Sequence, residues 1–252
     1  MLAVTVAKSL RAVRRGLVTG GAGVFLLALA PIGRAAPAPT VDQLPPKVKT
    51  DAQEFTRELG KLHEPTGKGG PADVEWVKAN VVRMMRLDQY VRQFAQTPQT
   101  KKYSDDERRA FSSWYTPASK AALQANVTDL KVIIKENEWV DRKKFGDSID
   151  YDARVLVQYA DFDAPFQKEM LGLLKKLYPQ GRTNPQNYAY LYDSLAAADG
   201  KSQLYGTQGR CAGPGEWKPL PIADEAQVEK RRADVGLEPL SAYAARYASV
   251  CR

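Results

Sequence analysis

The sequence predicts a mainly α-helical fold with one small β-hairpin inserted near the C-terminus. Apolar residues recur at three- and four-residue spacing along most of the chain, which is the pattern of amphipathic helices. Late in the chain, a glycine-rich loop separates two short runs that resemble strands. The 252 residues are 44% hydrophobic and 26% charged, which is usual for a globular protein with a sizeable core.

Residues 1–35 are predicted to form a secretory signal peptide. Basic residues cluster at positions 8–15, an apolar run follows at 17–30, and small residues precede a cut between Ala35 and Ala36. The apolar run is shorter than a membrane span requires. We therefore expect an exported protein, periplasmic or secreted, with no membrane span after cleavage. An uncleaved N-terminal anchor is the alternative.

The charge pattern argues against nucleic acid as a partner. The formal net charge is +8, from 37 basic and 29 acidic residues. Five of the basic residues, and no acidic residue, lie in the first 36 positions. The remaining 32 basic residues barely exceed the acidic ones, whereas nucleic-acid binding needs a clustered basic face.

The next two regions are a proline-rich linker at residues 36–50 and an N-terminal helical region at residues 51–146. In this part of the chain the periodicity predicts helices over residues 50–61, 72–96, 104–117 and 118–139. Ser104 followed by three acidic residues is a strong helix start. Pro117 is expected to kink or end the helix that begins there.

Residues 147–252 are predicted to form a second helical region that contains the hairpin. Capping residues and apolar spacing predict helices that start near Asp150, Asp163, Asn184 and Asp224, with a last helix around residues 240–247. The two strands of the hairpin are predicted at residues 203–207 and 216–219.

The two cysteines, Cys211 and Cys251, are predicted to form a disulfide, because an exported chain meets an oxidising compartment. The alternative is a pair of free thiols. A disulfide would tie the hairpin region to the end of the chain.

Several kinds of chemistry lack their usual residues. The only histidine is His63, in a glycine-rich loop, and no cysteine lies near it. The sequence has no zinc-type ligand spacing, no P-loop and no dinucleotide-binding glycine motif. We therefore expect no metal and no cofactor, and an enzyme is not the favoured interpretation.

Polar candidates for a ligand site concentrate between residues 158 and 232. On a strand, Gln203, Tyr205 and Thr207 would share one face, with Leu204 opposite, and could form a ligand wall. The alternative is that these side chains only form hydrogen bonds within the hairpin and its packing, and that the aspartates at 161 and 163 only cap helices. The full candidate set is Gln158, Tyr159, Asp161, Gln167, Asp193, Gln203, Tyr205, Thr207, Gln208, Arg231 and Arg232.

The C-terminal half also resembles a bacterial family of domains of unknown function. The motifs that carry the resemblance are Gln158-Tyr159-Ala160-Asp161, Phe166-Gln167, Tyr190-Leu191-Tyr192-Asp193-Ser194, Tyr205-Gly206-Thr207-Gln208 and Arg231-Arg232-Ala233-Asp234-Val235-Gly236-Leu237. The family pattern has histidine where this chain has Tyr159, and arginine where it has Ser194. The resemblance implies that an activity using that histidine is lost or changed, or that a binding pocket is altered.

Three functions remain open at this point. The first is an exported binding or accessory protein of the cell envelope, with a polar cleft around the hairpin for a small molecule, a peptide or a glycan. The second is an envelope hydrolase that uses Asp161 or Asp193 as an acid or base. The third is a module that binds an envelope protein through its N-terminal helices.

Overall fold

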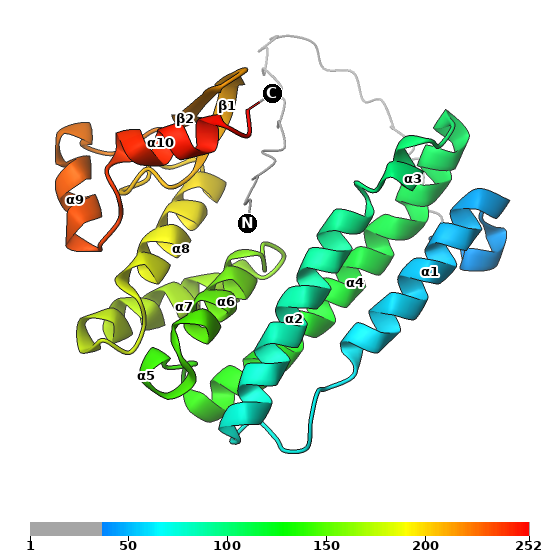
Figure 1. Ribbon diagram of the computed structural model, residues 1–252, viewed down its shortest axis with the longest axis horizontal. Coiled ribbons are helices and arrows are strands. Elements are labelled where there is room, and N and C mark those ends of the chain that lie inside the picture. The colour runs from blue at the N-terminus through cyan, green and yellow to red at the C-terminus, as the bar shows by residue number, and fades with distance from the viewer. Residues whose placement is uncertain (1–36, 252) are drawn as a thin grey trace, which may run out of the picture.

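A computed structural model describes residues 37–251 of the chain and confirms the mainly helical fold with one C-terminal hairpin (Figure 1). The predicted signal peptide and its cleavage site lie outside the described residues. The α-helices are α1 (Pro46–His63), α2 (Val74–Phe94), α3 (Pro98–Lys101), α4 (Asp105–Asn137), α5 (Arg142–Phe145), α6 (Asp147–Gln158), α7 (Ala164–Leu177), α8 (Pro185–Ala198), α9 (Val228–Asp234) and α10 (Leu240–Ala248). Short 3-10 turns occur at Val41–Gln43, Tyr178–Gln180 and Glu225–Gln227.

The hairpin consists of β1 (Gly209–Gly213) and β2 (Glu216–Pro219), which pair antiparallel. The second strand lies where the sequence predicts it, but the prediction for the first strand is wrong. Residues 203–208 precede β1 and form no strand, apart from one isolated bridge between Gln203 and Ile222. Gly206 has a positive φ of 69° within this segment, a conformation that breaks strand alternation and favours glycine.

The long helices α1, α2 and α4 lie side by side in one part of the molecule, and α5 to α10 with the hairpin form the other (Figure 1). Helix α2 belongs to both parts. Its first half packs into a core with α4, α6, α7 and α8, and its second half packs into an aromatic core with α1 and α4. In the aromatic core, Phe55 contacts the rings of Phe94 and Trp114. Helix α2 therefore packs into both hydrophobic cores and connects the two parts of the molecule.

Two helices differ from their predicted bounds. Helix α1 begins at Pro46, inside the segment predicted as linker, because proline suits the first position of a helix. Helix α4 starts with the predicted Ser104 cap and continues through Pro117. Pro117 and Ser113, whose carbonyl loses its helical partner there, are both exposed, so water can satisfy that carbonyl.

Asp150 does not cap a helix as predicted, because α6 already begins at Asp147. It is instead fully buried, and its carboxylate accepts hydrogen bonds from the Trp139 indole at 2.7 Å, the Thr183 hydroxyl at 2.6 Å and the Asn184 backbone at 2.8 Å. From its position on α6, Asp150 thereby links the segment after α4 to the start of α8.

Candidate functional site

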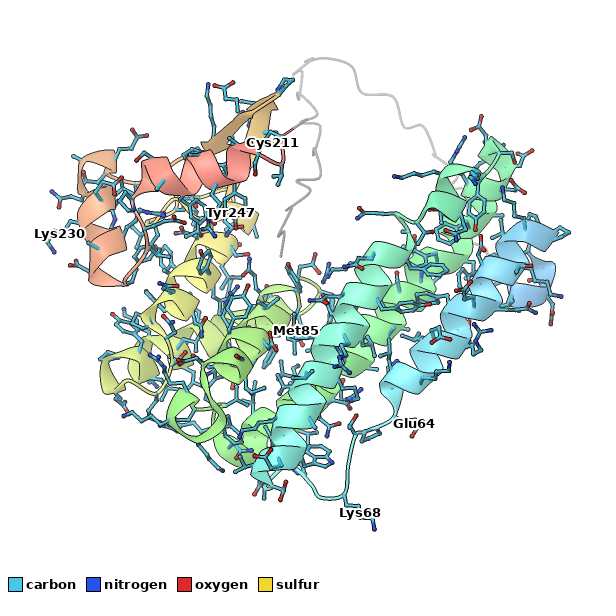
Figure 2. The ribbon with its side chains drawn as sticks, in the orientation of Figure 1. Glu64, Lys68, Met85, Cys211, Lys230 and Tyr247 are labelled. Atoms are coloured by element: carbon cyan, nitrogen blue, oxygen red, sulfur yellow. A yellow bond between two sulfur atoms is a disulfide. The ribbon has the colours of Figure 1, made fainter. Side chains whose placement is uncertain are left out.

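A cavity of about 730 Å³ lies where α2, α6, α8 and α10 face the hairpin and the segment before it. Figure 2 shows Met85 and Tyr247 facing each other across this region from opposite parts of the molecule. The volume lies within the range of small-molecule sites. Polar and aromatic side chains dominate its lining: Gln89, Gln93, Tyr151, Arg154, Gln158, Tyr159, Gln186, Tyr190, Thr207, Gln208, Trp217, Glu238, Tyr243, Arg246 and Tyr247.

Arg154 on α6 is the most buried cation of this lining, with 4% of its surface exposed. Its guanidinium donates to Gln158 Oε1 at 2.6 Å and, more weakly, to Asn187 Oδ1 at 3.4 Å. The rings of Tyr151 and Tyr190 lie 4.7 and 5.0 Å from it. Burial lowers the pKa of Arg154, and the neighbouring groups that oppose this effect are tyrosines. Among residues 37–251, no carboxylate lies within ion-pair distance of it; Asp152 interacts with it at longer range, where the charge of Arg154 partly offsets the effect of burial, which raises the pKa of Asp152.

Three tyrosines and Arg246 form one wall of the cavity. The rings of Tyr243 and Tyr247 on α10 lie 4.7 Å apart, and Tyr190 on α8 faces Tyr243 at 6.5 Å. The Tyr243 hydroxyl donates to the Thr207 carbonyl at 3.0 Å. Burial raises the pKa of both Tyr190 and Tyr243. These phenols therefore stay protonated at neutral pH and act as hydrogen-bonding groups.

Four of the candidates from the sequence line this cavity: Gln158, Tyr159, Thr207 and Gln208. Gln158 accepts a hydrogen bond from Arg154, and the Gln208 amide donates to the Thr207 hydroxyl at 3.1 Å. The Tyr159 ring packs under the Arg92 guanidinium at 4.2 Å, and burial raises the pKa of Tyr159.

Asp193 lies outside the cavity lining and organises the segment before β1. Its carboxylate accepts three backbone N–H groups, from Leu204 at 2.8 Å, Tyr205 at 3.1 Å and Thr207 at 2.9 Å. Burial raises the pKa of Asp193, and the three donors oppose that effect. Since these partners are all donors, the ionised carboxylate is the form that satisfies them. This arrangement assigns Asp193 to holding the segment in place.

Gln203, Arg231 and Arg232 also bind backbone atoms of this region. The Gln203 amide donates to the carbonyls of Gln208 and Leu220, and it accepts from the Gln208 backbone at 2.9 Å. Arg231 donates to Leu204 O at 2.7 Å, and Arg232 donates to the carbonyl of Tyr205. The three side chains therefore fix the course of the chain between α8 and β1.

Of the remaining three candidates, Tyr205 is buried in the core outside the cavity lining, with its ring 6.4 Å from those of Tyr188 and Tyr192. The other two lie at the junction of α6 and α7. Gln167 is buried and donates to the carbonyls of Val157 and Gln158 at 3.0 and 2.9 Å. Asp161 is exposed at the turn between the helices. Its neighbour Asp163 caps α7 through the Phe166 N–H and pairs with Lys131 at 2.6 Å. The carboxylate that Asp161 approaches is instead the buried Asp88 of α2, whose pKa is raised mainly by burial and further by the charge of Asp161.

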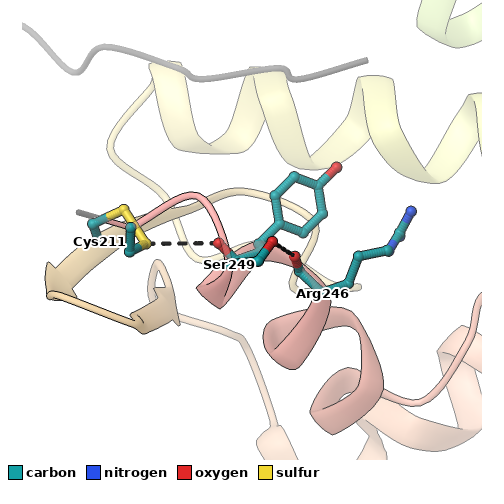
Figure 3. The surroundings of a disulfide bond; sticks show 5 residues. Cys211, Arg246 and Ser249 are labelled. Atoms are coloured by element: carbon teal, nitrogen blue, oxygen red, sulfur yellow. Dashed lines mark hydrogen bonds between the residues drawn. A yellow bond between two sulfur atoms is a disulfide. The ribbon is translucent and has the colours of Figure 1, made fainter.

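The predicted disulfide is confirmed. Cys211 of β1 and Cys251 after α10 are bonded, with their Cα atoms 5.4 Å apart (Figure 3). The bond lies next to the last turn of α10, where Ser249 donates to the Arg246 carbonyl at 2.8 Å. Because α10 supplies Tyr243, Arg246 and Tyr247 to the cavity, the disulfide fastens one of its walls to the hairpin.

Residues 77–249 match the family of unknown function DUF6624. The chain belongs to this family. The DUF6624 match extends N-terminal of the segment that carries the resemblance in the sequence, to include most of α2 and all of α4. It also contains every residue that lines the cavity. No curated protein and no solved structure matches the chain.

Two further features of this DUF6624 protein concern membranes and metals. None of the helices within residues 37–251 combines the length and apolarity that a membrane span needs. In the same range, no three His, Cys, Asp or Glu residues gather in a way that could hold a metal ion.

The most important cavity residue, Arg154, is absent from the candidates that the sequence suggests. A signal for it exists, because Arg154 interrupts the apolar run from Ala153 to Val157, and a charge within such a run is seldom buried without a partner. Gln89 of α2 and Trp217 of β2 carry no comparable signal. They reach the cavity only through the packing of distant segments.

Proposed function

We propose that this protein is an exported binding protein of the cell envelope that holds a small polar molecule in the cavity between α2, α6, α8 and α10. The observation that carries the proposal is the composition of the cavity. Tyrosines, a tryptophan and glutamine amides converge there from five separate elements. Aromatic rings offer flat apolar surface with a polar edge, and amides both donate and accept hydrogen bonds.

A binding role agrees better with the cavity than hydrolysis does. Among residues 37–251, Glu238 is the one carboxylate residue that lines it, and it is paired with Arg246. Asp193 is occupied by backbone donors, and Asp161 is exposed outside the cavity. A general acid or base needs a carboxyl group within hydrogen-bond reach of the substrate. The disulfide supports the export part of the proposal, since such bonds persist in oxidising compartments.

Crystallographic fragment screening of the full chain tests this function and requires no identified ligand. We expect bound fragments to gather in the cavity. Gln89→Trp should abolish them, because Gln89 lies half-buried in the α2 wall and the indole would fill the space. Gln124→Trp is the matched control, since Gln124 is exposed on α4 and does not line the cavity. Fragments that bind only elsewhere, in crystals where the cavity is accessible, would overturn the proposal.

A further inference from the structure

We infer that the ligand carries a single negative charge, a carboxylate, which Arg154 binds at the base of the cavity. This inference rests on the proposed function and deepens it. An arginine that is 96% buried is normally neutralised by a carboxylate. Arg154 instead has two amide oxygens and two tyrosine side chains in contact with it, while the part-buried Asp152 acts on it only from beyond ion-pair distance.

The carboxylate of Asp150 does not serve as the missing partner. Its oxygens accept from Trp139, Thr183, Asn184 and Asn187, all at 2.8 Å or less. The Asn187 side chain stands between the two charges: its Nδ2 donates to Asp150, and its Oδ1 accepts weakly from Arg154. The Asp150 carboxylate is thus occupied by hydrogen bonds that hold the start of α8 against α6.

The cavity's other charges cancel each other. Arg246 forms an ion pair with Glu238, and both residues line the cavity. Arg154 is the third charged residue that the described part of the chain contributes to the lining, so these groups together carry one excess positive charge. A monoanion neutralises that charge, whereas a phosphate dianion would leave a negative charge in a partly enclosed site.

The hydrogen bonds of the guanidinium indicate how the carboxylate binds. Nε donates to Asn187, and one of the two N–H groups of Nη1 donates to Gln158. The second N–H of Nη1 and both N–H groups of Nη2 are left for a ligand or for the Tyr151 hydroxyl, the other polar group that acts on the guanidinium through a hydrogen bond. One carboxylate oxygen can accept from Nη2, in a charge-assisted bond of the strong class, and the second can accept from Tyr151. The tyrosine hydroxyls and glutamine amides elsewhere in the lining then face the neutral part of the ligand.

The test is an NMR titration of the Arg154 Nε–Hε resonance in the full chain, with acetate as the probe and acetamide as its neutral isostere. The resonance is assigned by its loss in Arg154→Lys. At constant ionic strength, we expect acetate to shift it saturably, with at least about tenfold tighter binding than acetamide. Phosphate should bind more weakly than acetate.

Gln89→Trp should abolish the acetate shift while leaving Arg154 in place, and Gln124→Trp should keep it. Both variants leave Arg154 itself unchanged. Equal binding of acetate and acetamide, no saturable shift, or tighter binding of phosphate would overturn the carboxylate assignment. If fragments bind in the cavity but any of these results is obtained, the proposed binding function stands and only the carboxylate assignment fails. Failure of the proposed function is thus distinguishable from failure of this inference.

Discussion

Replacing Asp193 by asparagine should destabilise the protein strongly, although the two side chains have nearly the same shape. Oδ1 accepts from Leu204 and Tyr205, and Oδ2 accepts from Thr207. Asparagine has one oxygen, so its amide nitrogen must face a buried N–H group. One hydrogen bond is then lost, and two buried donors oppose each other.

The magnitude follows from these contacts. Hydrogen bonds to a charged group contribute about 1.5–3 kcal/mol each, and a buried donor without a partner costs about 1–3 kcal/mol. We expect Asp193→Asn to lower the free energy of unfolding by about 3–5 kcal/mol, measured by urea denaturation followed by circular dichroism. Asp199→Asn is the control, since Asp199 is exposed just after the same helix, and should change stability by less than about 0.5 kcal/mol. A loss below about 1 kcal/mol for Asp193→Asn would refute the structural role assigned to this carboxylate.

Three further predictions concern the hairpin and its surroundings. Gly209→Ala should cost about 1–3 kcal/mol, because its Cβ would meet the Trp217 ring at 2.1 Å, whereas Gly213→Ala, with a nearest atom at 3.8 Å, should be neutral; equal unfolding midpoints would contradict this. Reducing the disulfide, which closes a loop of 40 residues, should cost about 4 kcal/mol, and an unchanged melting temperature in reductant would argue against it. Burial raises the pKa of Tyr205 from 10.0 to about 12, so the stability it contributes is present below about pH 10 and lost as pH rises through about 12. In Tyr205→Phe, the urea unfolding midpoint should fall less steeply over that pH range than in the wild type. Equal slopes for the two proteins would contradict the assignment.

Local signals in the sequence predict much of the fold. The Ser104 cap with its acidic first turn, and the apolar stripes of the later helices, are sufficient to place α4, α7 and α8. The first hairpin strand is predicted too early because Gln203 to Thr207 alternates like a strand. The alternation arises instead from a loop that wraps a buried aspartate and turns at Gly206. No short-range pattern shows that Asp193, ten residues earlier, controls this loop.

The candidate site is predictable only in part, for a related reason. Gln158, Tyr159, Thr207 and Gln208 stand out by their polarity, and they line the cavity. The decisive residue, Arg154, escapes prediction because it lies on the buried face of an amphipathic helix. Its importance lies in the absence of a carboxylate partner, which depends on three-dimensional packing. Two further walls come from α2 and α10, which are far apart in the sequence.

The most direct test of the binding account is a crystal structure of the protein as it is recovered from the periplasm of an expression host. The account predicts density in the cavity, with one oxygen of a carboxylate-sized group within hydrogen-bond distance of Arg154 Nη2. It also predicts that Glu238 remains paired with Arg246. An Arg154 guanidinium paired with a carboxylate of the protein itself, in a space filled by the protein's own side chains, would contradict it.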